Sequence, residues 1–239
     1  MTQKQNTKII WAGDSTVAHN YFSTFPQTGL GQVMHRYLRE NVEIVNLAVN
    51  GRSTKSWIDE QRMVDAYFQL QTGDFFFIQF GHNDKKKEDP QRYVEAFGEY
   101  QENLRKFIHV ARNKGAIPVL ISPILRIETD EEGQLINSHE DYPQAMAEVA
   151  RGEGVAFLNL TQISTKFVEA KSVEACRKYF MHLEPSVYPA YPEGLKDNTH
   201  LTQLGATVFA GLIAQALYDM GSPYREVLLE GVTDFRLEV

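Results

Sequence analysis

Cysteine is almost absent from this sequence: Cys176 is the only one among 239 residues. A single thiol cannot form an intramolecular disulfide, and no Cys/His spacing along the chain resembles a zinc site. A disulfide-stapled scaffold and a zinc-binding module are therefore excluded, and no metal or other cofactor is expected. Cys176 is expected to pack as a small hydrophobic residue.

The chain also lacks a long apolar run and an excess of positive charge. Only one short apolar stretch precedes Gly13, so we expect neither a secretory signal nor a membrane span, and we predict a cytoplasmic location. The 24 basic and 31 acidic side chains leave a net charge of −7. Nucleic acids and anionic membranes bind basic surfaces, so neither is expected as a partner. The oligomeric state is not predicted.

Short β-branched and aromatic runs recur along the chain, and each is apolar enough to be buried on both faces. Apolar residues make up 43% of the sequence, which is sufficient for a substantial core. The predicted strands cover residues 8–12, 43–47, 75–80, 118–122 and 156–159. Strands buried on both faces are typical of a parallel sheet covered by helices on each side.

Helical periodicity fills the segments between these strands. The clearest pattern covers 91–113, with Asp89-Pro90 before it and Gly115 after it as start and stop signals. Further helices are predicted over 32–40, 57–70, 141–151, 162–170 and 202–220. The alternation predicts an α/β fold: one domain over 1–239, three layers α/β/α around a five-stranded parallel sheet, with the ligand site at the carboxyl ends of the strands.

Two irregular stretches, 123–140 and 181–196, are long enough to be substrate-facing loops. The tail over 221–239 has no clear pattern, so its structure is not predicted.

Ser15 directly follows the first predicted strand, which places its hydroxyl at the predicted active edge. A serine hydroxyl needs a base within hydrogen-bond reach and a third group that orients the base. Asp197 and His200 are expected on a turn before the last helix, where residues three apart lie on one side. Asp197 is then expected to hold Nδ1 of His200 while Nε2 faces Ser15. These three residues are the predicted catalytic triad.

Donors for the oxyanion of a tetrahedral intermediate are expected at three strand ends. Gly51, after the second strand, has no Cβ and lets its backbone N–H approach closely. Asn83, after the third strand, adds a side-chain amide, and the backbone N–H of Ser15 completes the set. The predicted oxyanion hole is therefore Ser15, Gly51 and Asn83.

Four ordered blocks resemble the signature blocks of the SGNH (GDSL-type) hydrolases: Gly-Asp-Ser at 13–15, Gly51, Gly-His-Asn-Asp at 81–84 and Asp-Asn-Thr-His at 197–200. Within that superfamily they are similar to the rhamnogalacturonan acetylesterase branch. The resemblance implies a flavodoxin-like SGNH hydrolase fold and the triad and oxyanion hole named above. It also implies a serine esterase that forms an acyl-enzyme and hydrolyses O-acetyl esters on carbohydrate, with acetylated rhamnogalacturonan oligosaccharides as the expected substrate.

Other functions remain open at this stage. A general short-chain carboxylesterase, a lysophospholipase or lipase, and a thioesterase share the nucleophile, but lipases usually expose a long apolar groove. A metallophosphoesterase has a similar Gly-Asn-His-Asp element, but its further metal-binding motifs are missing. A sugar-binding module that lost its chemistry is disfavoured by the complete triad. Four aromatic residues over 179–191 suit either sugar rings or the core: Tyr179, Phe180, Tyr188 and Tyr191.

A uronic-acid substrate would need local cations on a protein of net charge −7. Arg52 follows Gly51 and Lys85–Lys87 follow Asn83, so Arg52 and Lys85 are predicted to contact substrate; the alternative is a structural Arg52 and a solvated lysine loop. His82 is expected to pack or hydrogen bond near the site, and it is a further candidate for substrate contact. The remaining histidines match no block and are expected to be ordinary ones: His19, His35, His109, His139 and His182.

Overall fold

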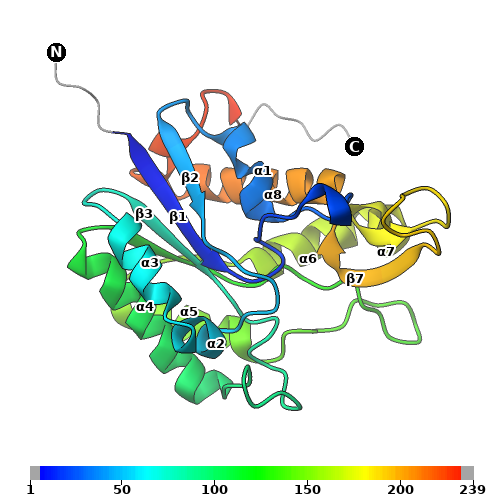
Figure 1. The fold of residues 1–239 in the computed structure, drawn as a ribbon, viewed down its shortest axis with the longest axis horizontal. Coiled ribbons are helices and arrows are strands. Elements are labelled where there is room, and N and C mark those ends of the chain that lie inside the picture. Colours follow the sequence, from blue (N-terminus) through cyan, green and yellow to red (C-terminus); the bar gives the residue numbers. More distant parts are fainter. Residues whose placement is uncertain (1–5, 233–239) are drawn as a thin grey trace.

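The computed structural model describes residues 6–232 and places a parallel sheet at the centre of the fold (Figure 1). Five strands pair in the order β2-β1-β3-β4-β5, and every neighbouring pair is parallel. Their bounds are β1 Thr7–Gly13, β2 Val42–Asn46, β3 Phe75–Gln79, β4 Ile117–Ile121 and β5 Ala156–Leu158. The predicted five-stranded parallel sheet is confirmed, and its strand order is that of flavodoxin-like folds.

Helices cover both faces of the sheet (Figure 1). One face carries α2 (Thr54–Asp59), α3 (Arg62–Gln69), α4 (Gln101–Asn113) and α5 (Tyr142–Glu153); the other carries α1 (Leu30–Val33), α6 (Leu160–Lys171) and α8 (Gln203–Asp219), with the short α7 (Val173–Cys176) after α6. Alternate residues of β1 enter opposite cores: Ile9 and Trp11 on the α8 side, Ile10 and Ala12 on the α4 side. The predicted three-layer α/β/α arrangement is therefore confirmed.

Three predicted helices differ from the structure. The pattern over 91–113 gives α4 only from Gln101; the π-type turn η3 (Ala96–Tyr100) precedes it, because Gly98 has a non-helical φ of −143° and ψ of −114°. The segment 57–70 is two helices, separated at Gln61, whose φ is 58°. The segment 32–40 is divided between α1 and the 3-10 turn η2 (Met34–Tyr37). Apolar periodicity reports which residues face the core and is insensitive to such local breaks in the backbone.

A second, two-stranded sheet lies where a loop was expected. β6 (Phe180–Leu183) and β7 (Leu195–Leu201) pair antiparallel, so the predicted loop over 181–196 is wrong at both of its ends. The 3-10 turn η4 (Arg177–Tyr179) leads into β6. The other predicted loop, 123–140, contains no helix or strand, only one isolated bridge between Thr129 and Leu135.

The first part of the carboxyl-terminal tail packs on the core. The 3-10 turn η5 (Tyr224–Val227) follows α8, and Leu228, which is 1% exposed, forms a bridge with Leu38. This contact joins the tail to the end of η2. The rest of the tail, 233–239, lies outside the described residues.

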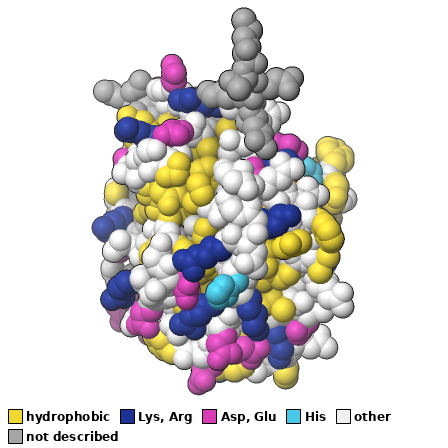
Figure 2. Space-filling model, turned by 90° about the vertical axis from the view of Figure 1, so that its left-hand side faces the viewer, with side chains coloured by type: hydrophobic (Ala, Val, Ile, Leu, Met, Phe, Trp, Pro, Cys, Tyr) yellow, Lys and Arg dark blue, Asp and Glu magenta, His cyan; other side chains and the backbone are white. Residues whose placement is uncertain are grey.

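The surface that Figure 2 shows carries acidic and basic side chains interspersed with one another. Such a mixed surface differs from the continuous basic patch by which proteins bind nucleic acid. Over residues 6–232, no helix combines the length and apolar character that crossing a bilayer requires. The absence of a nucleic-acid partner stays a prediction.

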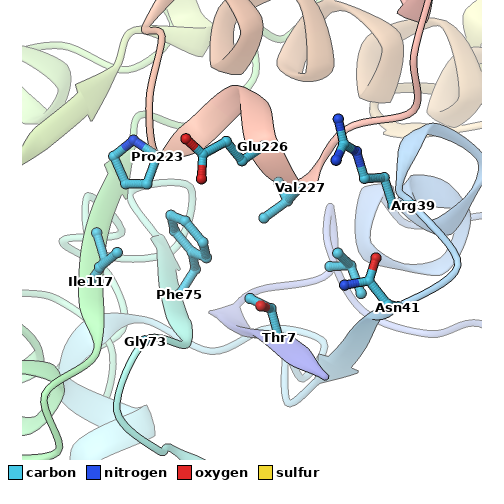
Figure 3. Close-up of a pocket in the computed structure, with 10 residues that line it drawn as sticks. Thr7, Arg39, Asn41, Gly73, Phe75, Ile117, Pro223, Glu226 and Val227 are labelled. Atoms are coloured by element: carbon cyan, nitrogen blue, oxygen red, sulfur yellow. The ribbon is translucent and has the colours of Figure 1, made fainter. Parts of the chain in front are cut away.

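A pocket of about 330 Å³ opens at the amino ends of three strands (Figure 3). Thr7, Phe75 and Ile117, which begin β1, β3 and β4, line it together with Val227 of η5. Parallel sheets of this kind bind ligands at the opposite, carboxyl edge. The pocket therefore lies away from the edge where Ser15 and Asn83 follow their strands.

Replacing a helical glycine by alanine should change the free energy of unfolding in opposite directions at Gly205 and Gly152. A Cβ on Gly205, in the first turn of α8, would lie 1.8 Å from the carbonyl oxygen of Tyr179, whereas a Cβ on Gly152, in α5, would meet nothing within 4 Å. Gly205→Ala should lower the free energy of unfolding by about 2 kcal/mol or more, because backbone must move. Gly152→Ala should raise it by about 0.5 kcal/mol. Urea unfolding measures both; a neutral Gly205→Ala would show that α8 does not dock as closely as described.

Candidate active site

Ser15 lies on a tight turn at the end of β1. Asp14 builds this turn: its Oδ1 accepts hydrogen bonds from the backbone N–H and the hydroxyl of Thr16 at 2.9 and 2.8 Å, and its carbonyl accepts from the N–H groups of Val17 and Ala18. Asp14 is fully buried, whereas Ser15 is only partly buried. The turn therefore holds the Ser15 hydroxyl at the carboxyl edge of the sheet, and Asp14 has a structural role in this turn.

The side chains of Ser15, His200 and Asp197 form a continuous hydrogen-bonded chain. His200 Nε2 lies 2.9 Å from Ser15 Oγ, and His200 Nδ1 lies 2.6 Å from Asp197 Oδ2. A carboxylate accepts only, so Nδ1 carries a proton and donates it to Asp197. Nε2 of the neutral ring is then free to accept the Ser15 hydroxyl proton. The predicted contacts of the triad are present in the structure.

A bulge in β7 brings Asp197 and His200 to the same side. Leu201 pairs with Phe180, but Met181 pairs with Asp197, so three residues of β7 have no partner on β6. In a regular strand, residues three apart point to opposite faces. The sequence correctly predicted the contact between Asp197 and His200 but placed it on a turn before α8. In the structure a bulged strand brings the two side chains together.

The Asp197 carboxylate is held ionised by its neighbours. Its Oδ1 accepts hydrogen bonds from the backbone N–H groups of Thr199 and His200 at 2.7 and 3.1 Å. Burial by itself raises the pKa of Asp197, but the His200 ring and these N–H groups outweigh it and lower the pKa to about 2. Asp197 is therefore an anion at neutral pH, which fixes the tautomer and orientation of His200.

Two cross-links connect the loops that carry the predicted oxyanion donors. Asn83 Nδ2 donates to the carbonyl of Arg52 at 3.0 Å, and Asp84 Oδ1 accepts from the backbone N–H and hydroxyl of Thr54 at 2.8 and 2.6 Å. Gly51 precedes Arg52 with a φ of 76°, a conformation that favours glycine. Asn83 is 4% exposed and keeps a second amide hydrogen. The loops after β2 and β3 are therefore joined to each other, although β1 lies between these two strands in the sheet.

Asp14 and Asp84 are buried acids whose pKa values are raised. Burial raises the pKa of Asp14 from 3.8 to about 6, although the hydrogen bonds from Thr16 oppose the rise. Burial also raises the pKa of Asp84 to about 7, against the two hydrogen bonds from Thr54, and the Asp14 carboxyl adds to the rise. One oxygen of each carboxyl, Oδ2, has no hydrogen-bond partner among the described residues. Asp14 thus shapes the turn after β1, and Asp84 joins the loop after β3 to the amino terminus of α2.

His82 is buried against a histidine that the sequence left unassigned. Its ring packs edge to face on His139 with 4.5 Å between centroids, and it is 2% exposed. Burial, followed by the charges of His139 and Arg126, holds the pKa of His82 well below its usual range. His139 Nε2 lies 2.6 Å from the carbonyl of Ile124, and burial lowers its pKa to about 3. Both rings are neutral near pH 7, in agreement with the expected packing role of His82; a substrate contact stays a prediction.

The two predicted substrate cations already have acidic partners. Arg52 forms a salt bridge with Glu60 at 2.8 Å, and Lys85 Nζ lies 3.8 Å from Glu140. The structural alternative for Arg52 is thus observed, and a substrate role for either residue stays a prediction. Sequence reasoning missed Arg126, whose Nε is buried without a partner among the described residues and whose charge acts on both buried histidines.

The loop that carries Arg126 is bonded to β7 through the next residue. The next residue, Ile127, donates its backbone N–H to the carbonyl of Asn198, inside the β7 bulge, at 2.9 Å. No motif marks Arg126 in the sequence. The only signal that could have found it is its place in the irregular stretch 123–140, which was expected to face the substrate.

Of the four aromatic residues that suited either sugar contact or the core, two are buried and two are partly exposed. Tyr179 and Phe180 are 1% and 0% exposed and belong to the α8-side core. Tyr188 and Tyr191 are partly exposed on the loop between β6 and β7.

Cys176 is buried, as expected for a small hydrophobic residue. Within the described range, no three His, Cys, Asp or Glu side chains are grouped so that they could hold a metal ion.

Replacing Asp84 by Asn should flatten the pH dependence of stability. A carboxyl whose pKa is higher in the folded protein, about 7, than in the unfolded chain, 3.8, binds more protons when folded, so stability is lost as the pH rises between these values. The slope from one such group approaches about 1.4 kcal/mol per pH unit. Asp84→Asn keeps an oxygen for Thr54 and should lose this slope.

Urea unfolding at several pH values between about 4 and about 7 measures the slope. The matched control is Asp65→Asn, which changes an exposed carboxyl on α3 and should keep the wild-type slope. Parallel slopes for wild type and Asp84→Asn would show that Asp84 is already ionised in the folded protein across this range.

Known proteins are similar to this chain in sequence over most of its length. The model of the GDSL-like lipase/acylhydrolase family matches residues 12–208. The probable rhamnogalacturonan acetylesterase YesY of Bacillus subtilis is 36% identical over 222 residues, covering 93% of this chain and 97% of YesY. The rhamnogalacturonan acetylesterase RhgT of the same organism is 33% identical over 226 residues, covering 95% of this chain and 96% of RhgT.

Solved structures share the fold at lower identity. The YxiM protein of Bacillus subtilis has a TM-score of 0.78 at 24% identity; the match covers 91% of this chain but only 58% of that one. The acetylxylan esterase Axe2 of Geobacillus stearothermophilus has a TM-score of 0.62 at 15% identity, covering 94% of this chain and 98% of that one. Matched by the family model over most of its length and by two relatives over nearly all of it, the chain belongs to the GDSL-like lipase/acylhydrolase family.

Proposed function

We propose that this protein is a serine esterase that removes O-acetyl groups from carbohydrate, with acetylated rhamnogalacturonan oligosaccharides as its substrate. The observation that carries the proposal is the hydrogen-bonded chain from Asp197 through His200 to Ser15, with distances of 2.6 and 2.9 Å. The names of YesY and RhgT, both similar to this chain over nearly its full length, support the choice of substrate.

The geometry supports acylation through the Ser15 hydroxyl. His200 Nε2 takes the hydroxyl proton as Ser15 Oγ attacks the acetyl carbonyl carbon. The backbone N–H groups of Ser15 and Gly51 and the second amide hydrogen of Asn83 stabilise the oxyanion that forms. The C–O bond to the sugar then breaks, and the sugar oxygen leaves with the proton from His200. Acetyl-Ser15 and a free sugar hydroxyl result.

Deacylation repeats the same steps with water. His200 removes a proton from a water molecule, whose oxygen attacks the acetyl carbonyl carbon of acetyl-Ser15. Collapse of the second tetrahedral intermediate releases acetic acid, and Ser15 Oγ regains a proton from His200. Asp197 stabilises the imidazolium ion in both halves and stays ionised throughout, in keeping with its lowered pKa of about 2.

The polar loop over 123–140 favours a sugar over a long acyl chain. The irregular stretch 123–140 carries three consecutive acidic residues, Asp130 to Glu132, that are exposed. A lipase or lysophospholipase would instead need a long apolar groove next to the nucleophile. A general short-chain esterase and a thioesterase share the same chemistry and are distinguished by substrate.

Several features of the protein are proposed without direct support from the site. We propose that residues 1–239 form one domain, and the support for this is that α8 packs back on the sheet built from residues 7–158. A cytoplasmic location and independence from metal ions stay predictions of the sequence, and the oligomeric state is not assigned.

Ser15→Ala should lower kcat by about 10⁴-fold or more, because the nucleophile is lost while the fold is kept. Acetate release from acetylated rhamnogalacturonan and xylan oligosaccharides, and hydrolysis of short- and long-chain aryl esters, are measured for wild type and variant, with urea unfolding as the folding control. Wild type should prefer the acetylated sugars. A preference for long-chain esters would identify a lipase, and an active Ser15→Ala protein would exclude the acyl-enzyme.

Asn83→Ala should lower kcat by about 10²–10³-fold with little change in KM, because the amide donor acts mainly in the transition state. The change also removes the hydrogen bond to the carbonyl of Arg52. Asn83→Asp keeps the size of the side chain and lacks the donor, so it should be impaired to a similar degree. Unchanged kcat in either well-folded variant would remove Asn83 from the oxyanion hole.

A further inference from the structure

The segment 19–27 is an excursion from the turn that carries Ser15. After that turn the chain leaves the sheet edge, forms the 3-10 turn η1 (Phe22–Thr24), and returns to α1. Two hydrogen bonds close the excursion at its base: Leu30 N–H donates to the carbonyl of Thr16 at 2.8 Å, and Gly31 N–H donates to that of Val17 at 3.1 Å. The base of the excursion is therefore bonded to the two residues that directly follow the nucleophile.

The returning part of this excursion is also joined to the strand that carries the base. Thr28 N–H donates to the carbonyl of Leu201 at 3.0 Å, and Gln27 forms a bridge with Thr202. Leu201 directly follows His200. Figure 1 shows the dark blue turn η1 beside the orange strand β7. The segment 19–27 thus stands at the edge of the site, fixed to the chain on both sides of the Ser15–His200 contact.

Three aromatic side chains in this segment face solvent: Tyr21 is 75% exposed, Phe22 91% and Phe25 41%. A single exposed aromatic ring is ordinary. Three within five residues at the edge of a catalytic site leave a large apolar area in water, and such areas mark binding surfaces.

The loop between β6 and β7 contacts this segment at Thr24 and Phe25. Phe25 packs edge to face on Tyr188 with 5.9 Å between centroids, and the Tyr191 hydroxyl donates to the carbonyl of Thr24 at 3.3 Å. Tyr191 lies close enough to the triad that the Asp197 charge, after burial, contributes to raising its pKa. The segment 19–27 is thus held at Thr24 and Phe25 by the loop that carries Tyr188 and Tyr191.

We propose that Tyr21, Phe22, Phe25 and Tyr188 form an aromatic wall that binds sugar rings of the oligosaccharide beyond the one that carries the reacting acetyl group. This inference rests on the proposed function. A pyranose ring exposes C–H groups on its faces, and these pack on aromatic rings while its hydroxyl groups stay in water. A chain of sugars whose acetyl group reaches Ser15 must extend past the edge of the site, and the aromatic wall occupies that edge.

Binding at this distance from the ester lets the enzyme distinguish an acetylated oligosaccharide from a small acetyl ester. The interaction involves no reacting atom, so it contributes to the binding of substrate and transition state alike and is measured in KM. Loss of one ring contact of about 0.5–1.5 kcal/mol corresponds to a roughly two- to tenfold loss.

The test compares Phe22→Ala with a matched control, Phe68→Ala, which removes a 75% exposed ring from α3 on the far side of the sheet. Both side chains are solvent-exposed, so both variants should fold as wild type does. For Phe22→Ala, the ratio of kcat/KM on an acetylated rhamnogalacturonan oligosaccharide to that on 4-nitrophenyl acetate should fall roughly two- to tenfold, through KM. Phe68→Ala should keep the wild-type ratio.

A second measurement is independent of catalysis: calorimetric binding of the deacetylated oligosaccharide to wild type and to Phe22→Ala. Weaker binding by Phe22→Ala supports the aromatic wall even if wild type fails to release acetate from any acetylated sugar, which would refute the proposed function alone. An unchanged ratio together with unchanged binding overturns the wall. The wall is also overturned if wild type sediments as a dimer and Phe22→Ala sediments as a monomer, because the rings would then join two copies of this chain.

Discussion

The contact between His200 Nε2 and Ser15 Oγ joins residues that are 185 positions apart, and much of the fold serves to make it possible. Ser15 is held by the turn at the end of β1, and His200 by a strand that is not part of the main sheet. The bulge in β7 turns both Asp197 and His200 toward Ser15. The pairing of β7 with β6, and the bridge from Gln27 to Thr202, then fix that strand against the sheet edge.

Buried carboxyl groups hold the loops around this contact. Asp14 shapes the serine turn, and Asp84 connects the loop of Asn83 to the amino terminus of α2 through Thr54. Each is fully buried, with a pKa raised by burial, so each weakens the fold when it ionises. This cost is the kind of local instability that functional sites carry in return for well-placed reactive groups.

Around the site the cations have acidic partners, whereas several aromatic rings are exposed to solvent. The cations that follow Gly51 and Asn83 are paired with nearby acids, Arg52 with Glu60 and Lys85 with Glu140. The exposed aromatic rings lie in the segment 21–25, shortly after Ser15 in the sequence, and one of them, Phe25, packs on Tyr188. A substrate bound here would meet an aromatic edge beside the triad and an irregular polar stretch, 123–140, whose Ile127 is bonded to the β7 bulge.

The sequence by itself determined the five strands, the parallel sheet and the residues of the triad, because buried strands have a distinctive composition and the four blocks are local. It did not determine the breaks at Gly98 and Gln61, which are backbone conformations that apolar periodicity does not encode. Only the tertiary structure placed His139 against His82, buried Tyr179 and exposed Phe22. These outcomes depend on contacts between segments that are distant along the chain, and local sequence carries no record of such contacts.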